Sequence, residues 1–337
     1  MVDKNKINKN DITFIVQGAV EPKKTKKCLK SIRRYFPTSR IILSTWKGTD
    51  CSDLPYDKLI FNEDPGFEYL DTNKKLKYNI NRMFVSTQNG LRECNTKYAF
   101  KVRSDLVFHS DHILRYFDKY PKYLEEFKVF KHKVIVGNLF SMKYEVGEDG
   151  KFLTPFHVSD FFQFGLTEDL QLLYDVPLVD LQDFSRYFER HEKPRKYPVR
   201  RYDETRLWRF PPEQYLNLTL ARRKQEIKFD TCLDYNEELM ALYEKFVLSN
   251  YIILDYDQTK IKSQKFTFKL YASLNFLSET LWPGLYRNYV YESDYKDIVD
   301  SAFKLGVDKR KLIRRLFAPY HRNKELVKKI ANHLGMN

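Results

Sequence analysis

Long apolar runs, glycine, proline and cysteine are all scarce in this sequence. No hydrophobic stretch approaches the ~20 residues that a membrane-spanning helix needs. Only 11 glycines and 13 prolines occur among 337 residues, which excludes collagen-like and low-complexity chains. The 4 cysteines form no C-x-x-C pair and fit no zinc spacing. We therefore interpret them as reduced core thiols, which favours a reducing compartment.

Several well-known signatures are also missing. No G-x-G-x-x-G follows the first predicted strand, and no Walker A sequence occurs, which disfavours dinucleotide-binding and P-loop proteins. Neither H-E-x-x-H nor G-x-S-x-G is found. The first residues, MVDKNKINKND, are polar and lack the apolar centre of a signal peptide. We therefore expect a cytoplasmic protein.

The residues that are abundant indicate a globular, basic protein. Hydrophobic residues make up 42% and charged residues 31% of the chain, a balance that can build a core of ordinary size. Lysine and arginine total 59 against 45 acidic residues, a net charge of +14. Partners of such a protein are expected to be anionic: nucleic acid, acidic lipid or phosphorylated small molecules. Composition alone does not choose among them.

Strands and helices alternate through the first hundred residues. Short apolar runs predict strands, and helical periodicity predicts helices between them. The expected strands are 12–16, 41–45, 58–62 and 98–102, and the expected helices are 24–36 and 77–94. This order predicts an α/β domain with a largely parallel sheet.

Fewer elements are predicted in the rest of the chain. We expect a helix over 111–120, a strand over 134–137, a helix capped by Thr167 and a helix opened by Pro212. From residue 236 onward the pattern is mainly helical. We divide the chain into a domain over 1–230, with halves of about 10–110 and 111–230, and a helical extension over 231–337 that ends in a basic tail.

Polar or turn-forming residues follow each of the first four predicted strands. Ligands of parallel sheets bind beyond the carboxyl ends of the strands. The residues at those ends are Gln17, Gly18, Thr45, Asp64 and the tripeptide Arg103-Ser104-Asp105. The sequence therefore predicts that they line one pocket.

Arg103 and Asp105 carry the strongest local signal. A carboxylate after a buried strand can coordinate a divalent cation that holds a diphosphate, and Arg103 can neutralise the same diphosphate directly. The alternative is that Asp105 caps a turn while Arg103 pairs with a surface acid. The position of the tripeptide after the fourth strand favours the functional interpretation.

The other strand ends and the second helix offer weaker candidates. Asp64, in the turn Asp64-Pro65-Gly66, either shapes that turn or holds a base or ribose. Gly18 allows a ligand to approach the backbone beside Gln17, although a glycine after a strand is often only a turn. Asn81 and Arg82 lie near the start of the second helix and could point toward the nucleotide pocket, because the amino end of a helix favours anions. Their alternative is a polar turn that faces solvent.

An acidic residue embedded among aromatics is the candidate base. Asp160 lies three residues after His157 in the segment FHVSDFF, and a carboxylate there is partly desolvated. The alternative is a hydrogen-bonded aspartate that orders a turn, but burial without a role or partner is costly. Glu213 is a second candidate, although a glutamate in the first turn of a helix is commonly a dipole partner.

Two basic segments remain. Residues 186–209 and the tail 308–337 could contact nucleic acid, but such runs usually face solvent and no RRM signature occurs. The tail carries nine basic and two acidic residues around an apolar stripe at Leu312, Ile313, Leu316 and Phe317. That pattern is typical of an amphipathic helix at an anionic membrane, or of a helix that packs on the preceding domain.

Several of these segments together resemble one family. FIVQGAV, SIRRYFPTSRIILSTWKG, DPG, NINRMFVSTQNGL, YAFKVRSDLVF, FHVSDFFQFG and PPEQYL, spread over about 10–225, are similar to the WavE-like lipopolysaccharide synthesis family. The resemblance implies a bacterial glycosyltransferase of the GT-A type, whose sheet binds a nucleotide sugar. It places Arg103-Ser104-Asp105 where such enzymes carry D-x-D, with arginine in place of the first aspartate. It also implies that Asp105 holds Mg²⁺ or Mn²⁺.

The resemblance extends to roles for individual residues. The diphosphate and nucleoside would contact Gln17, Gly18, Thr45, Asp64, Asn81, Arg82, Arg103 and Asp105. Asp160 would be the base for the acceptor hydroxyl, Glu213 the second candidate, and His157 an acceptor or support residue. The implied reaction moves a sugar from a UDP-linked donor to a capsule or lipopolysaccharide glycan. A lipid-linked acceptor would place this reaction at the inner face of the plasma membrane.

Two rival functions stay open at this point. A nucleotidyltransferase that activates sugars uses a similar sheet, but it usually carries a glycine-rich loop after the first strand, where this chain has Gln17-Gly18-Ala19-Val20. A non-catalytic basic protein that binds nucleic acid or membrane agrees with the charge, but it does not require the ordered strand-end residues. We expect no nucleic-acid partner, and the sequence leaves the oligomeric state open.

Overall fold

The computed structural model describes residues 7–70, 76–147, 150–192, 207–265, 277 and 281–291. The predictions for the basic tail 308–337 and for most of the segment 186–209 therefore lie outside the described residues. All bounds and contacts below refer to the described part of the chain.

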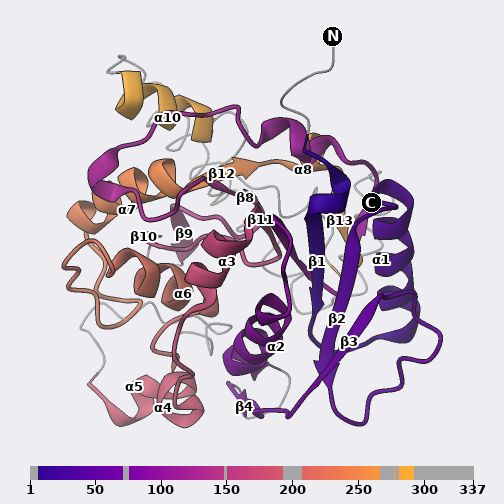
Figure 1. The fold of residues 1–337 in the computed structure, drawn as a ribbon. Coiled ribbons are helices and arrows are strands. Elements are labelled where there is room, and N and C mark those ends of the chain that lie inside the picture. The colour runs from indigo at the N-terminus through magenta and orange to yellow at the C-terminus, as the bar shows by residue number, and fades with distance from the viewer. Residues whose placement is uncertain are drawn as a thin grey trace, which may run out of the picture.

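The described residues form a central sheet of seven strands (Figure 1). In spatial order these are β12 (Tyr251–Leu254), β8 (Val134–Gly137), β11 (Phe162–Leu166), β6 (Tyr98–Arg103), β1 (Ile12–Gln17), β2 (Arg40–Trp46) and β3 (Lys58–Asn62). Neighbours pair in parallel except at β11, which runs antiparallel to both β6 and β8. The amino end of β11 therefore shares an edge with the carboxyl ends of the other strands. The predicted α/β class with a mostly parallel sheet is confirmed.

Strand β1 is buried on both faces, as its continuous apolar run predicts. Its six residues are all buried, which is typical of a strand covered by helices on both sides. Phe14 stacks on Phe100 with ring centres 4.9 Å apart and meets the edge of Phe36, which ends helix α1 (Pro22–Tyr35). The next residue, Ile15, faces helix α2 (Ile80–Arg92) at Gly90. Helices α1 and α2 thus cover opposite faces of the sheet (Figure 1).

Three local predictions differ from the structure. The second helix begins at Ile80 because Lys77–Tyr78 form strand β5, which pairs with β4 (Glu68–Tyr69). The predicted helix over 111–120 is a short 3-10 helix, η2 (His112–Tyr116). Thr167 is the first residue of α3 (Thr167–Tyr174) and not its cap, because its hydroxyl donates to the carbonyl oxygen of Thr96 at 2.7 Å.

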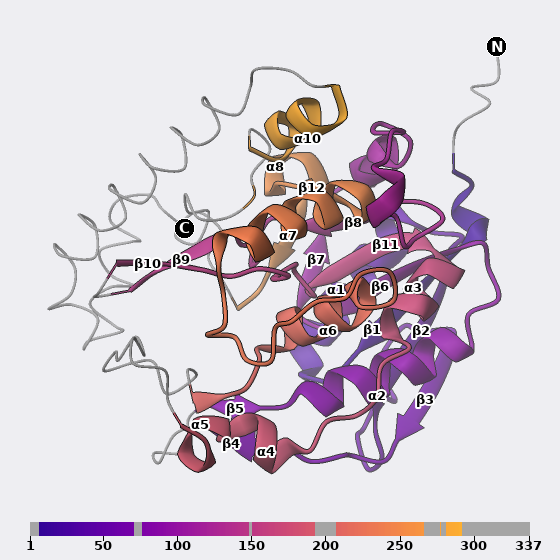
Figure 2. The same cartoon turned by 90° about the vertical axis from the view of Figure 1, so that its left-hand side faces the viewer.

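The chain beyond residue 230 contributes to the same sheet. Helix α7 (Glu237–Asn250) leads directly into β12, which pairs with β8, so the described part of 231–337 is not entirely helical. After α8 (Tyr256–Thr259), strand β13 (Ile261–Ser263) pairs with β7 (Leu106–Phe108). Helix α10 (Leu281–Tyr291) lies beside α7 (Figure 2). The proposed division near residue 230 stays a prediction.

The remaining elements surround this framework (Figure 2). They are η1 (Lys9–Asp11), η3 (Glu125–Phe127), the hairpin β9 (Tyr144–Gly147) and β10 (Gly150–Leu153), α4 (Leu181–Ser185), α5 (Tyr187–Arg190) and α6 (Pro212–Ala221). Pro212 is the first residue of α6, as predicted. All four cysteines are buried and free, which confirms that they are core thiols.

Candidate active site

The ends of β1 and β6 are tied together at the carboxyl edge of the sheet. The backbone N–H of Ser104 donates to the carbonyl oxygen of Gln17 at 3.3 Å, and the Ser104 hydroxyl donates to that of Ala19 at 2.7 Å. The side chain of Gln17 is buried and accepts a hydrogen bond from Ser86 of α2 at 2.8 Å. Gly18 has a φ of +103°, which favours glycine, and no atom would contact a Cβ there. The structure thus brings Gln17 and Gly18 beside the tripeptide 103–105.

Arg103 and Asp105 pair with each other. The Arg103 guanidinium donates from Nε to Oδ1 of Asp105 at 3.1 Å and from Nη2 to Oδ2 at 3.0 Å. The Asp105 side chain is only 4% exposed, so this carboxylate has lost its water and depends on the two charge-assisted bonds. The guanidinium also lies 4.3 Å from the ring centre of Phe161. The sequence predicts Asp105 either as a metal ligand beside Arg103 or as the cap of a turn, and neither alternative includes this buried pair of hydrogen bonds.

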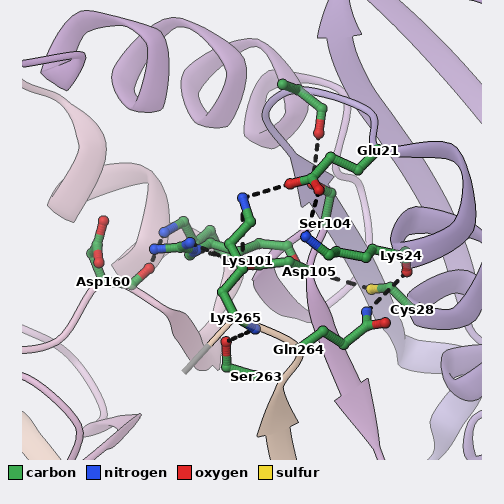
Figure 3. Close-up of polar contacts among 12 residues, drawn as sticks. Glu21, Lys24, Cys28, Lys101, Ser104, Asp105, Asp160, Ser263, Gln264 and Lys265 are labelled. Carbon is green, nitrogen blue, oxygen red and sulfur yellow. Dashed lines mark hydrogen bonds and ion pairs between the residues drawn. The ribbon is translucent and has the colours of Figure 1, made fainter. Parts of the chain in front are cut away.

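Two lysines and a second acid extend the cluster (Figure 3). Lys265 lies 3.9 Å from Oδ2 of Asp105 and 2.6 Å from Oε1 of Glu21. Lys24, in the first turn of α1, lies 2.6 Å from Oε2 of Glu21. The hydrogen bonds from Lys24 and Lys265 hold the pKa of Glu21 below its usual range. Sequence reasoning missed these three residues, because no local motif links Lys265 to the start of α1.

The surroundings of Asp105 do not fit a divalent metal. Both carboxylate oxygens already accept hydrogen bonds from Arg103, and Lys265 adds a second cation beside Oδ2. Mg²⁺ needs octahedral oxygen ligands and would have to displace the guanidinium. Among the residues that the structure describes, no three His, Cys, Asp or Glu side chains gather as a metal site would require. In this arrangement Asp105 is therefore not available as a metal ligand, and no chemical step is derived through a metal. Dependence on Mg²⁺ or Mn²⁺ stays a prediction.

Asp160 and Glu213 lie next to this cluster. Asp160 comes just before β11, and its carbonyl oxygen accepts a hydrogen bond from Lys101 of β6 (Figure 3). Glu213 is in the first turn of α6. Burial, and next the negative charge of Asp160, raise the pKa of Glu213 to about 8, while the charges of Arg103 and Lys101 oppose the shift. The structure therefore brings the two predicted acids into one electrostatic unit.

The electrostatics assign different states to these acids and their neighbours. Glu213 is mostly protonated near neutral pH because its pKa lies above 7. Lys101 is fully buried, and burial lowers its pKa to about 8. Glu213 and Lys101 thus both have pKa values of about 8, although one is an acid and the other a base. Such a pair with pKa values near neutral pH is typical of sites that move protons.

His157 supports this unit from the side. Its Nδ1 lies 2.8 Å from the carbonyl oxygen of Phe140, so Nδ1 carries the hydrogen and donates it, since a carbonyl only accepts. Nε2 then faces Glu213, 4.0 Å from Oε2. Phe140 has a φ of +65°, which is rare for a non-glycine residue and marks local backbone strain. His157 is thus held in one orientation toward the predicted acid.

Asp64 and Arg82 form a separate pair beyond β3. The Arg82 Nε donates to Oδ1 of Asp64 at 2.7 Å, and Nη2 donates to Oδ2. Asp64 Oδ1 also accepts the backbone N–H of Gly66 at 2.9 Å, which confirms the predicted turn. The hydrogen bond from Arg82 lowers the pKa of Asp64. The guanidinium lies 4.5 Å from the ring centre of Phe67, so an aromatic face, a cation and a carboxylate meet here.

Two predicted donor-binding residues have their polar groups inside the protein. Asn81 is buried and exchanges two hydrogen bonds with the backbone of Val179, at 2.9 and 3.0 Å, so its amide bridges two segments and does not face a ligand. Thr45 is fully buried, and its carbonyl oxygen accepts a hydrogen bond from Asn62 at 2.8 Å. Both residues therefore make hydrogen bonds that stabilise the structure around the edge of the sheet.

The fold and these strand ends define an α/β protein whose polar residues gather beyond the carboxyl ends of parallel strands, the position of ligand sites in this class. The chain matches the family described as WavE lipopolysaccharide synthesis over residues 12–317 and belongs to that family. The resemblance drawn from the sequence motifs is therefore confirmed, and the match extends beyond them. A search of curated proteins finds no match.

The family connects this chain with lipopolysaccharide synthesis. None of the helices in the described residues combines the length and the apolar character that crossing a membrane requires.

Proposed function

We propose that this protein is a glycosyltransferase that moves a sugar from a UDP-linked donor to a lipopolysaccharide or capsule glycan. One observation carries the proposal: a cationic cluster around Arg103 lies beside a pair of acids, Asp160 and Glu213, at the carboxyl edge of the sheet. Sugar transfer from a nucleotide sugar needs both parts, because charge grows on the leaving diphosphate while the acceptor hydroxyl loses a proton.

The step divides between these two parts. The bond between the anomeric carbon and the diphosphate oxygen breaks, and the acceptor oxygen forms the new bond to that carbon. Arg103, which is partly exposed, stabilises the leaving diphosphate. The proton of the acceptor hydroxyl goes to Asp160, because Glu213 is itself mostly protonated at neutral pH. The protonated Glu213 can then donate a hydrogen bond within the site, where Nε2 of His157 lies 4.0 Å from its Oε2.

The nucleoside half of the donor is assigned to the pair Asp64 and Arg82. These side chains, with the ring of Phe67, offer a carboxylate for hydrogen bonds and a flat surface for a base. Three strand spacings, about 14 Å, separate β3 from β6, which carries Arg103, along the sheet edge. That separation suits a nucleotide whose diphosphate lies near Arg103.

A screen of nucleotide sugars tests the proposal. The purified chain is incubated with UDP-, GDP- and ADP-linked sugars, with and without a lipopolysaccharide acceptor, and release of the nucleoside diphosphate is measured. We expect release from a UDP-sugar, and Asp160→Asn should lower the rate about 100- to 10,000-fold, as loss of a general base does. Asp111→Asn, at a surface pair with Lys9, is the matched control.

Two results would contradict the proposal. One is the absence of release from every donor by a folded protein. The other is release of pyrophosphate from UTP and a sugar phosphate, which would instead show a nucleotidyltransferase.

A further inference from the structure

We propose that Lys265 and Lys24 bind the donor diphosphate directly and thereby take the place of a divalent metal. The inference rests on the proposed function and deepens it, because it names the groups that hold the leaving group. It starts from the cluster of Glu21, Lys24, Lys265, Arg103 and Asp105 at the edge of the sheet (Figure 3).

The backbone holds Lys265 firmly in this position. Gln264 donates from its backbone N–H to the carbonyl oxygen of Asp105 at 3.0 Å, and its side chain donates to the carbonyl oxygen of Lys24 at 3.0 Å. The N–H of Lys265 donates to the Ser263 hydroxyl at 3.1 Å. Gln264, directly after β13, thus connects the segment before β7 with the first turn of α1 and places the next residue, Lys265, where the two meet.

The charges of the cluster leave room for an anion. Lys24, Lys265 and Arg103 carry three positive charges, and Glu21 and Asp105 carry two negative charges, so the sum is +1. Asp105 is buried at the floor, whereas the side chains of Lys24, Lys265 and Glu21 are 36%, 41% and 42% exposed. The exposed Glu21 is a single carboxylate between two ammonium groups.

A diphosphate can replace Glu21 in this arrangement. It offers several charged oxygens to the two ammonium groups, whereas Glu21 offers two, and a carboxylate that is partly exposed regains water when it turns outward. Asp105 remains paired with Arg103 and keeps the guanidinium facing the same anion. Two lysines and one arginine then carry the charge neutralisation for which other enzymes use a metal.

Binding in the presence of a chelator tests this inference. Inorganic pyrophosphate and UDP are titrated into the full chain by calorimetry, in EDTA and again with Mg²⁺. We expect both ligands to bind in EDTA, and Lys265→Met and Lys24→Met should each weaken binding about 10- to 100-fold. Lys262→Met and Lys23→Met are matched controls, because Lys262 is an exposed residue of β13, just before Lys265, and Lys23 is an exposed neighbour of Lys24 in α1. Both variants should bind as the unaltered chain does.

A double variant that keeps the net charge of the cluster unchanged separates direct contact between Lys265 and the anion from an effect of the net positive charge. Glu21→Gln combined with Lys265→Met removes one positive and one negative charge, so the local sum is unchanged. Binding weaker than that of the unaltered chain, with unchanged circular dichroism, supports direct contact by Lys265, because the local charge is the same in both proteins. Binding as tight as that of the unaltered chain would overturn it.

The remaining outcomes distinguish the inference from the proposed function. Pyrophosphate binding that requires Mg²⁺ would overturn the inference that Lys265 and Lys24 hold the diphosphate without a metal. If the same preparation still turned over a nucleotide sugar, the proposed glycosyltransferase activity would be supported. Failure of pyrophosphate to bind both in EDTA and with Mg²⁺ would also overturn the inference that Lys265 and Lys24 bind a diphosphate. Pyrophosphate binding in EDTA without turnover of any nucleotide sugar would support the anion site and contradict the proposed reaction.

Discussion

Burial sets the charge of the residues that face one another across the site. Glu213, in the first turn of α6, has a pKa of about 8 because burial and then the charge of Asp160 oppose its ionisation. Asp105 is also buried, and the cost of burying its charge is offset by two hydrogen bonds from the Arg103 guanidinium. Each arrangement leads to a measurable consequence when one member is changed.

The stability of Glu213→Gln should depend on pH differently from that of the unaltered chain. The glutamate ionises at 4.5 when exposed and at about 8 in the folded protein. Between these values the folded state holds one more proton, so the free energy of unfolding falls as pH rises, by about 1.4 kcal/mol per pH unit. Glutamine removes this dependence. Urea unfolding across that range should show the variant gaining relative stability with rising pH, by up to a few kcal/mol.

Two parallel stability profiles would show that Glu213 is not buried as a neutral acid. Glu168→Gln serves as control because Glu168 forms an exposed pair with Lys131. Its profile should follow that of the unaltered chain.

Replacing Asp105 should disable the site. Asp105→Ala removes both acceptors that hold the Arg103 guanidinium, and a misplaced group of this kind costs on the order of 100-fold in rate. Donor turnover measured beside Asp111→Ala, which breaks only a surface pair, checks the prediction. Turnover of Asp105→Ala equal to that of the control, with unchanged circular dichroism, would remove Asp105 from the site.

At the scale of elements, one antiparallel strand determines how the site is assembled. Because β11 runs against its neighbours, Phe162 at its start pairs with Val102 near the end of β6. Asp160 therefore reaches the same edge as Arg103, although a parallel strand would have placed it at the opposite edge. The short pairing of β13 with β7 brings Lys265 to this edge in the same way.

Helix α2 depends on a close approach to β1. A Cβ on Gly90 would lie 2.3 Å from Cγ2 of Ile15, a stiff and fully buried side chain. Gly90→Ala should therefore destabilise the protein by about 1–3 kcal/mol, despite the better helix propensity of alanine. In thermal unfolding of the two single variants and the double variant with Ile15→Ala, the cost of Gly90→Ala should shrink once Ile15 is truncated. Equal costs in both backgrounds would contradict this contact.

At the scale of the whole molecule, the net charge of +14 is the property that bears on partners. The segment 308–337, which lies outside the described structure, contains nine basic and two acidic residues and thus contributes +7 to this net charge. Each basic residue near an anionic surface contributes about 1 kcal/mol, and salt screens that attraction. A protein of lipopolysaccharide synthesis with this charge is expected to meet its acceptor at the inner face of the plasma membrane.

Sedimentation with vesicles tests the membrane prediction on the full chain. We expect the protein to sediment with vesicles of phosphatidylglycerol and phosphatidylcholine at low salt and to be released at high salt. Vesicles of phosphatidylcholine alone are the control and should leave it in the supernatant. Protein that stays in the supernatant with anionic vesicles at low salt would show that the tail does not act as a membrane anchor.

The sequence by itself determined the framework of this protein. The apolar runs that became β1, β2, β3, β6 and β8 and the stripes of α1 and α2 are local patterns, because burial of a strand or of one helix face depends on neighbours along the chain. The residues just past those strands follow from the same rule. Arg103 and Asp105 were therefore predictable as residues of one edge, and so was the family, from its ordered motifs.

Only the tertiary structure decided which of those residues meet. Asn81 is turned inward by its bonds to Val179, and Lys265 joins Glu21 and Asp105 from a remote segment. Such pairs depend on sheet order, strand direction and register, which are set by the packing of the whole core and leave no periodic signal in the sequence. The raised pKa of Glu213 belongs here too, because desolvation exists only after those segments have closed over it.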